Sequence, residues 1–143
     1  MSVAGRELGA AAVMFHTAIA DRQGLSTTEE KALDLLGRYG PLTAGELAER
    51  SGLAPASVTG LVTRLERKGF VRRVPHPQDG RRVLIEANRD RQAEYEPLFT
   101  DFVRSTEELY AKYSDEQLET IRDFLTEAAR RQRDATARLT GQG

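Results

Sequence analysis

The sequence contains no cysteine, so it can form no disulfide, no thiolate nucleophile and no thiol-based oxidant sensor. It has only two histidines, no His-Glu-x-x-His zinc motif and no glycine-rich phosphate loop after a strand. Adjacent carboxylates such as Glu29 and Glu30 fall on predicted helices, where neighbours point apart. We therefore expect no enzyme: no catalytic residue, no metal site and no cofactor.

Long apolar runs are also missing. No stretch approaches the roughly 20 apolar residues that a membrane-spanning helix needs, and no secretory signal sequence opens the chain. We expect a cytoplasmic protein without a membrane partner. Its 143 residues are the length of one domain, enough for a modest core.

The most informative stretch runs from Thr43 to Glu86. Thr43 and Glu46 form a capping box that begins a helix, and Gly52 suits the left-handed turn that ends it. Pro55 then begins a second helix, at a position where its missing N–H costs nothing. Two helices joined by a short glycine turn are typical of a helix-turn-helix.

The second helix has two distinct faces. Val58, Leu61, Val62 and Leu65 follow the helical period and predict a buried face. The rest of its surface combines small, hydroxyl-bearing and basic residues, which can approach base edges and phosphates. A solvated surface is the alternative for a lone helix, but the preceding helix and turn favour a recognition helix. Its predicted DNA-binding residues are Ser57, Thr59, Gly60, Thr63, Arg64 and Arg67.

A hairpin with a basic tip is predicted to follow. The run from Val71 to Val74 and the run from Val83 to Ile85 are β-prone, and turn-forming residues separate them. An arginine on a narrow hairpin suits the strongly negative minor groove of DNA. The hairpin's predicted DNA-binding residues are Arg72, Arg73, Asp79, Arg81 and Arg82.

Charge is segregated along the chain, although the formal net charge is only −1. The window from Arg50 to Arg82 holds eight basic and two acidic residues, a net charge of +6, which leaves −7 for the remainder. A basic surface on an acidic body is expected of a protein that binds DNA.

The segment from Leu25 to Glu86 carries a family resemblance in three stretches, the last of which ends at Ala87: LSTTEEKALDLL, ASVTGLVTRLERKGFV and HPQDGRRVLIEA. In them the chain resembles the MarR family of bacterial transcription regulators. The resemblance implies that Asp79 braces the wing arginine and that Arg81 enters the minor groove. Gly60 departs from the pattern, since many relatives carry a larger polar residue there. Ala87-Asn88 also replaces the usual threonine-rich start of the next helix.

The predicted fold is mostly α-helical: a winged helix-turn-helix with a two-stranded β wing, plus N- and C-terminal dimerisation helices. We expect one MarR-like domain over 1–143, with the DNA-binding lobe at 26–87 and the dimerisation helices at 1–24 and 88–143. Apolar stripes on those terminal helices exceed what so small a lobe can cover, which predicts a homodimer. A monomer with a helical cap is the alternative.

Details of the flanking segments are also predicted. Residues 3–22 form one helix, Ser26 caps the next, and Pro41-Leu42 pairs with the wing. After an Asn88 cap, we expect one long helix kinked at Pro97 rather than restarted there. Ser114 caps the last helix, which we expect to fray from Thr136 onwards.

The resemblance further implies a ligand-responsive repressor that binds a pseudo-palindromic operator in double-stranded DNA as a homodimer. The effector would be a small aromatic or phenolic anion. Candidate ligand-binding residues are His16, Tyr39 and Arg73. Packing at the dimer interface is the alternative role for His16, and simple exposure at a helix end is that for Tyr39. The alternative for the whole chain is a winged-helix protein-interaction module without an operator.

Overall fold

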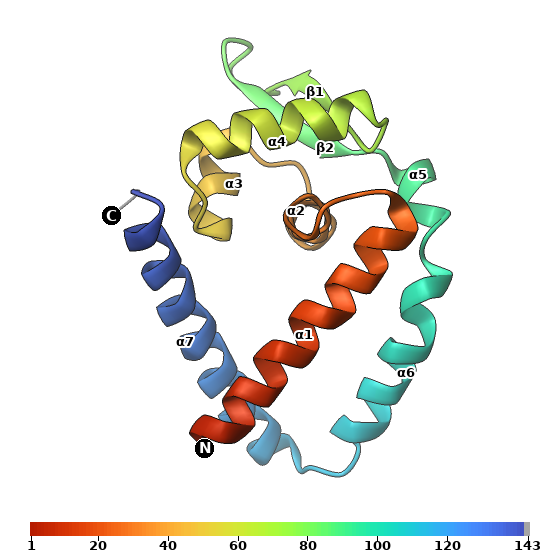
Figure 1. Cartoon of the computed structure of the whole chain (residues 1–143), viewed down its shortest axis with the longest axis vertical. Helices are drawn as coiled ribbons and strands as arrows, with labels where there is room; N and C mark the ends of the chain where they lie inside the picture. The colour runs from red at the N-terminus through yellow and green to blue at the C-terminus, as the bar shows by residue number, and fades with distance from the viewer. Residues whose placement is uncertain (142–143) are drawn as a thin grey trace.

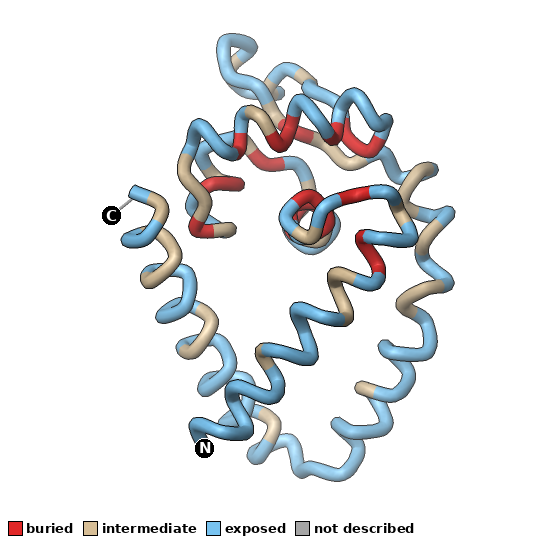
Figure 2. Tube along the Cα trace, viewed as in Figure 1, coloured by how far each residue is buried: buried red, intermediate tan, exposed pale blue. Residues whose placement is uncertain are grey.

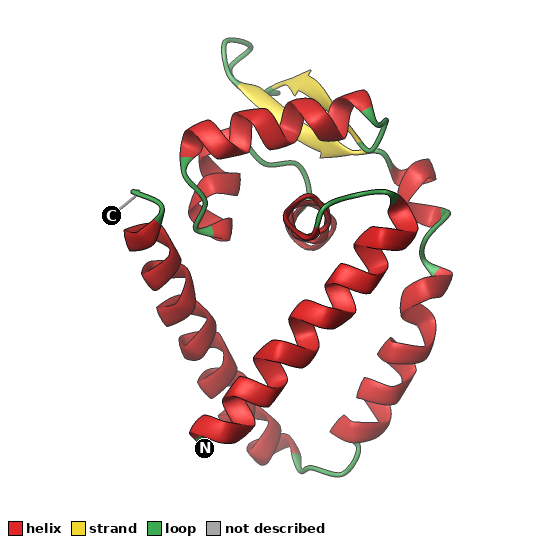
Figure 3. Cartoon of the chain, viewed as in Figure 1, coloured by secondary structure: helices red, strands yellow, loops and turns green. Residues whose placement is uncertain are grey.

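Within residues 1–141, which the computed structural model describes, the chain forms seven helices and one two-stranded antiparallel sheet (Figures 1 and 3). A helix-turn-helix and its wing form one end of the molecule, and three long helices extend from it (Figure 1). The elements are α1 (Ser2–Gln23), α2 (Thr27–Tyr39), α3 (Ala44–Ser51), α4 (Pro55–Arg67), β1 (Val71–Pro75), β2 (Val83–Ala87), α5 (Arg89–Ala93), α6 (Pro97–Tyr110) and α7 (Asp115–Leu139).

The hydrophobic core lies where α2, α3, α4 and the two strands meet, and Figure 2 shows the buried residues gathered there. The predicted inner face of α4 is confirmed. Val58, Leu61, Val62 and Leu65 are each at most 1% exposed, and Phe70 packs beside them. Burying each of these side chains contributes about 1.5–3 kcal/mol. The core therefore fixes α4 in one rotational setting.

Hydrogen-bonded caps set the start of four helices, as the sequence predicts. Capping boxes join Ser26 to Glu29, Thr43 to Glu46 and Ser114 to Gln117, each with both of its hydrogen bonds present. The Asn88 side chain accepts from the backbone N–H of Arg91 and caps α5. Each cap satisfies backbone donors that the first helical turn would leave unpaired.

The wing is an antiparallel hairpin in which Val71 pairs with Ala87 and Pro75 pairs with Val83. The predicted pairing of the Pro41-Leu42 segment with the wing is also present, at Leu42. Leu42 and Ile85 exchange two backbone hydrogen bonds of 3.1 and 2.7 Å, which attaches the α2–α3 connection to β2. The wing is therefore held to the helices by backbone pairing as well as by its buried side chains.

The prediction of one long helix after the wing, kinked at Pro97, is wrong. The structure ends α5 at Ala93 and restarts a helix at Pro97, with a turn between them. Proline has no N–H to donate to the carbonyl of Ala93. The turn instead uses shorter-range bonds, including Leu98 N–H to the Tyr95 carbonyl at 3.0 Å. Pro97 therefore takes the first position of α6, where its missing donor costs nothing.

The prediction that the last helix frays from Thr136 is also wrong, because α7 continues to Leu139. The Thr140 hydroxyl donates to the carbonyl of Gly52 at 2.8 Å, and Thr136 lies against the same glycine. In Figure 1, α7 returns from the far end of the molecule to α3. This contact between the helix-turn-helix turn and the C-terminal helix stabilises the last turn. The expectation for residues 142 and 143 lies outside the described residues.

A buried carboxylate ties α2 to the end of α4. Glu29 is 4% exposed, and the Lys68 ammonium donates to both its oxygens, at 3.1 and 3.4 Å. Lys68 also donates to the Gly24 carbonyl at 3.1 Å. Burial raises the pKa of Glu29, but hydrogen bonds from Lys68 and Ser26 outweigh it, so its pKa lies below the usual 4.5.

The terminal helices leave much apolar surface exposed, and α6 and α7 have no buried residue. None of the described helices is long and apolar enough to span a bilayer. The large exposed apolar side chains are Val3, Leu8, Val13 and Met14 on α1, Phe102, Val103, Leu109 and Tyr110 on α6, and Ile121, Phe124, Leu125 and Leu139 on α7.

Gly52→Ala is expected to lower the free energy of unfolding by about 2–4 kcal/mol, from left-handed strain and overpacking together. Gly52 has φ +80°, and an added Cβ would lie 2.9 Å from the Cβ of Thr136. Gly24→Ala is the matched control, because Gly24 has φ +70° but nothing within 4 Å of an added Cβ. Urea titration of both variants measures the difference. Equal losses of unfolding free energy in the two variants would show that crowding against α7 adds nothing to the destabilisation at Gly52.

Glu29→Gln is expected to flatten the acid side of the stability profile. Because the folded-state pKa of Glu29 is lowered, its ionised form stabilises the protein above pH 4.5. That contribution is lost as the pH falls through the folded-state pKa, below 4.5. Urea titrations between pH 3 and 7 measure this slope in both proteins. Lys68→Met should lower stability at pH 7, because it leaves a buried carboxylate without its cation. An unchanged slope in Glu29→Gln would contradict this account.

Candidate nucleic-acid interface

The outer face of α4 presents the side chains that the sequence predicts for a recognition helix. Because the inner face is fully buried, Ser57, Thr59, Thr63, Arg64 and Arg67 are all exposed. Figure 2 shows α4 along the outside of the lobe, buried only where it faces the core. Packing against α2 and α3 therefore positions this face, and no side chain on it is needed for the core.

Two threonine hydroxyls on this face already have hydrogen-bond acceptors within the helix. Thr59 donates to the Pro55 carbonyl at 3.2 Å, and Thr63 donates to the Thr59 carbonyl at 3.0 Å. A hydroxyl has one proton and two lone pairs. Thr59 keeps both lone pairs for an outside donor, whereas Thr63 also accepts from Arg73 at 3.2 Å and keeps one. Such acceptors suit the amino groups of cytosine or adenine.

Gly60 makes room for a neighbouring arginine. A Cβ at this position would lie 3.3 Å from a terminal guanidinium nitrogen of Arg64, so that side chain folds back along the helix over the glycine. The Nε atom of Arg64 also lies 4.0 Å from a carboxylate oxygen of Glu29. Gly60 is half-buried and has no side chain to read a base; it influences the surface through the position of Arg64.

Arg73 joins the wing to the recognition helix. From β1 it donates to Glu66 at 2.6 Å and to the Thr63 hydroxyl at 3.2 Å. On the same strand, Arg72 donates to Glu86 of β2 at 2.9 Å. Both arginines therefore have carboxylate partners in the free protein. These carboxylates fix the positions of both arginines before DNA binds, and they neutralise part of the arginines' positive charge.

The wing tip holds its arginine as the resemblance implies. Asp79 accepts from the backbone N–H of Arg81 at 3.1 Å and from its Nε at 3.3 Å. The Arg81 side chain is nevertheless 93% exposed, so it extends into solvent from a braced base. Arg82 is exposed too, and its backbone N–H donates to the Asp79 carbonyl at 3.0 Å. The tip therefore presents two neighbouring guanidinium groups.

The three predicted ligand residues do not form one site. Arg73 lies on the wing, bonded to Glu66. His16 has Nδ1 2.6 Å from a Glu30 carboxylate oxygen, within the α1–α2 contact. Burial raises the pKa of Glu30, and the interaction with His16 offsets only part of that rise. Tyr39 is 49% exposed and lines a cavity elsewhere.

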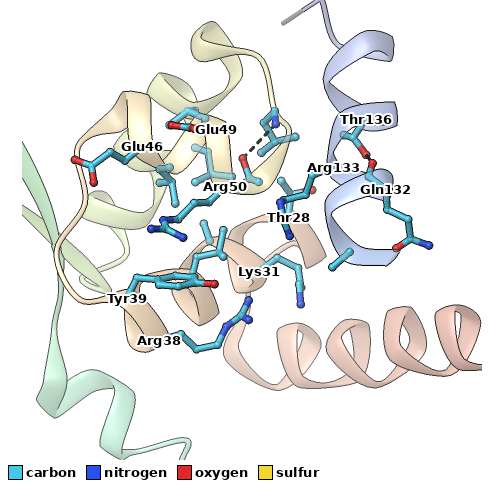
Figure 4. Close-up of a pocket in the computed structure, with 18 of the residues that line it drawn as sticks. Thr28, Lys31, Arg38, Tyr39, Glu46, Glu49, Arg50, Gln132, Arg133 and Thr136 are labelled. Carbon is cyan, nitrogen blue, oxygen red and sulfur yellow. Dashed lines mark hydrogen bonds between the residues drawn. The ribbon is translucent and has the colours of Figure 1, made fainter. Parts of the chain in front are cut away.

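That cavity has a volume of about 690 Å³ and lies between α2, α3, α4 and α7 (Figure 4). In addition to Tyr39, the cavity is lined by Arg50 and Arg133. No local sequence pattern predicts that these two arginines line one cavity, because Arg133 reaches it only through the return of α7. Within residues 1–141, no group of three or more histidine or carboxylate side chains could hold a metal ion.

Known proteins share both the sequence and the fold. The MarR family model matches residues 25–83. The HTH-type transcriptional regulator YcgE of Bacillus subtilis is 43% identical over 124 residues, which cover 87% of this chain and 80% of that protein. The homoprotocatechuate degradative operon repressor of Escherichia coli is 26% identical over 117 residues, covering 82% of this chain and 79% of the repressor.

Solved structures agree at the level of the fold. The structure of NadR in complex with 4-hydroxyphenylacetate superposes with a TM-score of 0.71 at 23% identity, covering 89% of this chain and 90% of that one. The helix-turn-helix, the wing and the flanking helices thus occur together in a known architecture. The chain belongs to the MarR family of winged helix-turn-helix transcriptional regulators.

Proposed function

We propose that this regulator binds a pseudo-palindromic operator as a homodimer and represses transcription there. The observation that carries the proposal is the pairing of an exposed, hydroxyl-rich face of α4 with a wing arginine braced by Asp79. Base reading needs donors and acceptors on a helix narrow enough for the major groove, and minor-groove binding needs an extended cation. Arg73 joins the wing to this helix within one lobe, through its bonds to Glu66 and Thr63.

In this mechanism each recognition helix enters a major groove. Ser57, Thr59 and Thr63 meet base edges, and Arg64 meets bases or phosphates. Each wing follows into the flanking minor groove through Arg81. The remaining basic residues contact phosphates, and Gly60 and Asp79 position the arginines beside them. Those phosphate contacts are assigned to Arg67, Arg72, Arg73 and Arg82.

Dimerisation is supported by the apolar side chains that α1, α6 and α7 leave exposed. An exposed apolar surface of this extent is typical of an interface. A twofold dimer also doubles the number of DNA contacts and places two recognition helices about 10 base pairs apart. We assign residues 26–87 to the DNA-binding lobe, and 1–24 with 88–143 to the dimerisation region.

Repression controlled by a small ligand is supported by what related proteins are named for. One relative is an operon repressor, and one neighbour in structure holds 4-hydroxyphenylacetate. An aromatic or phenolic anion that binds between the lobe and the terminal helices would change the separation of the two recognition helices. His16, Tyr39 and Arg73 stay candidates for its contacts. We place the protein in the cytoplasm, where its operator would be, and assign it no catalytic role.

Selection of bound fragments from a genomic library at about 0.15 M salt, a concentration that suppresses weak nonspecific binding, tests the proposal. We expect a pseudo-palindrome, bound with a steep loss of affinity as salt rises because several phosphates are neutralised. Sedimentation of the complex should give two chains for each operator. Binding without sequence preference, or none, would instead favour a winged-helix module that binds an acidic protein.

Arg81→Ala is expected to weaken operator binding by about 10–100-fold, since a well-placed groove contact contributes 1–3 kcal/mol. Fluorescence anisotropy at fixed salt measures the loss. Arg104→Ala is the matched control, because it removes the same charge from α6, outside the lobe. There the Arg104 guanidinium lies 2.7 Å from a carboxylate oxygen of Asp101. Unchanged affinity in Arg81→Ala, or an equal loss in both variants, would remove the wing from the interface.

A further inference from the structure

Gly60 lies at the centre of the outer face of α4. At about 100° per residue, its position on the helix is opposite Val58 and Leu65, which are fully buried in the core. The centre of this face is the part of a recognition helix that comes nearest to base edges, whereas phosphates flank the groove on either side. Because glycine has no side chain, the centre of the face is left open to a neighbouring residue.

Arg64 occupies the space above Gly60. One of its terminal guanidinium nitrogens lies 3.3 Å from the position of a Cβ added at Gly60. Within residues 1–141, no other atom comes within 4 Å of that position, apart from the backbone of α4 and the two adjacent residues. Side chains on a helix tilt towards its N-terminus, and residues four apart lie one above the other. The guanidinium of Arg64 is thereby carried back by one turn, from the C-terminal part of α4 to its middle.

The contacts of Arg64 leave its terminal nitrogens available. Its Nε atom lies 4.0 Å from a carboxylate oxygen of Glu29, and both oxygens of Glu29 also accept from Lys68, at 3.1 and 3.4 Å. Within residues 1–141, the two terminal nitrogens of Arg64 form no hydrogen bond, and the side chain is 51% exposed. On the wing, by contrast, Arg73 uses both of its terminal nitrogens to bond Glu66 and Thr63. Arg64 therefore presents an unoccupied fork of donors at the centre of the helix.

We propose that Arg64 reads a guanine in each half-site of the operator and that Gly60 determines this specificity. The terminal nitrogens of Arg64 donate to O6 and N7 of the guanine, the two major-groove acceptors that match the arginine fork. Gly60 is a positioning residue, because a Cβ there would displace the guanidinium from the centre of the helix. This inference rests on the proposed function. It names one base of the operator, and it assigns Arg64 to a base and not to a phosphate.

Gly60→Ala separates a positioning role from a structural one. Alanine is more favourable than glycine in a helix interior, so the substitution should not destabilise the protein. The guanidinium of Arg64 must move, however, because 3.3 Å is closer than a Cβ normally approaches another atom. A glycine with only a structural role would keep the same base preference after substitution, whereas a positioning glycine would lose preference for guanine.

The test uses the selected operator and variants of it, each with one base pair replaced in one half-site. Fluorescence anisotropy at fixed salt gives the affinity for each variant. For the unaltered protein we expect one G·C pair whose replacement by A·T weakens binding about 10-fold or more. Replacing the same guanine with its 7-deaza analogue, which lacks the N7 acceptor, should also weaken binding.

The protein variants assign that preference to its residues. Arg64→Gln should bind the G·C pair, the A·T replacement and the deaza analogue about equally. Gly60→Ala should lower the discrimination at the same pair by about 3-fold or more, with stability in urea unchanged or raised. The double variant should discriminate no less than Arg64→Gln alone, because Gly60 acts through Arg64.

Gly45→Ala is the matched control. Gly45 is an exposed glycine within α3, and a Cβ there would meet only the Thr43 hydroxyl, at 3.9 Å. This variant should keep the full base preference. Equal loss of affinity for every operator variant in Arg64→Gln would indicate a phosphate contact and overturn the inference, as would undiminished guanine preference in Gly60→Ala. Failure of the unaltered protein to select any operator would contradict the regulator proposal as well, whereas the other two outcomes contradict this inference alone.

Discussion

Every candidate DNA contact on the recognition helix depends on one packing constraint, the complete burial of one face of α4. Val58, Leu61, Val62 and Leu65 lie against α2 and α3 and are closed off by Phe70. Turning the helix by one residue, about 100°, would carry arginine and threonine into the core and leucine into solvent. The core therefore determines which residues can face a nucleic acid. The outer face carries no packing role, so its residues are free to vary with the DNA sequence that is read.

Acidic side chains organise the basic surface instead of merely reducing its charge. Glu29 holds Lys68 at the end of α4, Glu66 holds Arg73 beside the recognition helix, and Asp79 holds Arg81 on the wing. A long cation that is already oriented loses less conformational entropy when it binds. The pairs at the surface contribute little to stability, since solvent screens them. Their main effect is on geometry, and the buried Glu29 is the exception that also stabilises the lobe.

The contact between α7 and the helix-turn-helix turn joins two regions that otherwise differ in character. Gly52 allows close approach because it has no side chain, and Thr136 and Thr140 of the C-terminal segment lie against it. The lobe is well packed, whereas α6 and α7 have no buried residue. A change at the terminal helices therefore has a direct mechanical path to the turn that precedes the recognition helix.

The family resemblance implied the pairing of Asp79 with Arg81. Local chemistry by itself determined much of the rest: the capping boxes, the glycine turn, the buried face of α4 and the hairpin. Each is a relation between residues a few positions apart, which the sequence displays directly. The helix at Pro97 was mispredicted because the spacing of apolar residues is the same in a kinked helix and in two successive helices. The missing N–H of proline favours a short turn between two helices. Only the tertiary structure could decide that α7 returns to Gly52, that Glu29 lies buried beneath Lys68, and that Arg50, Tyr39 and Arg133 line one cavity. Those relations join residues far apart in the chain, and they follow from how whole helices pack.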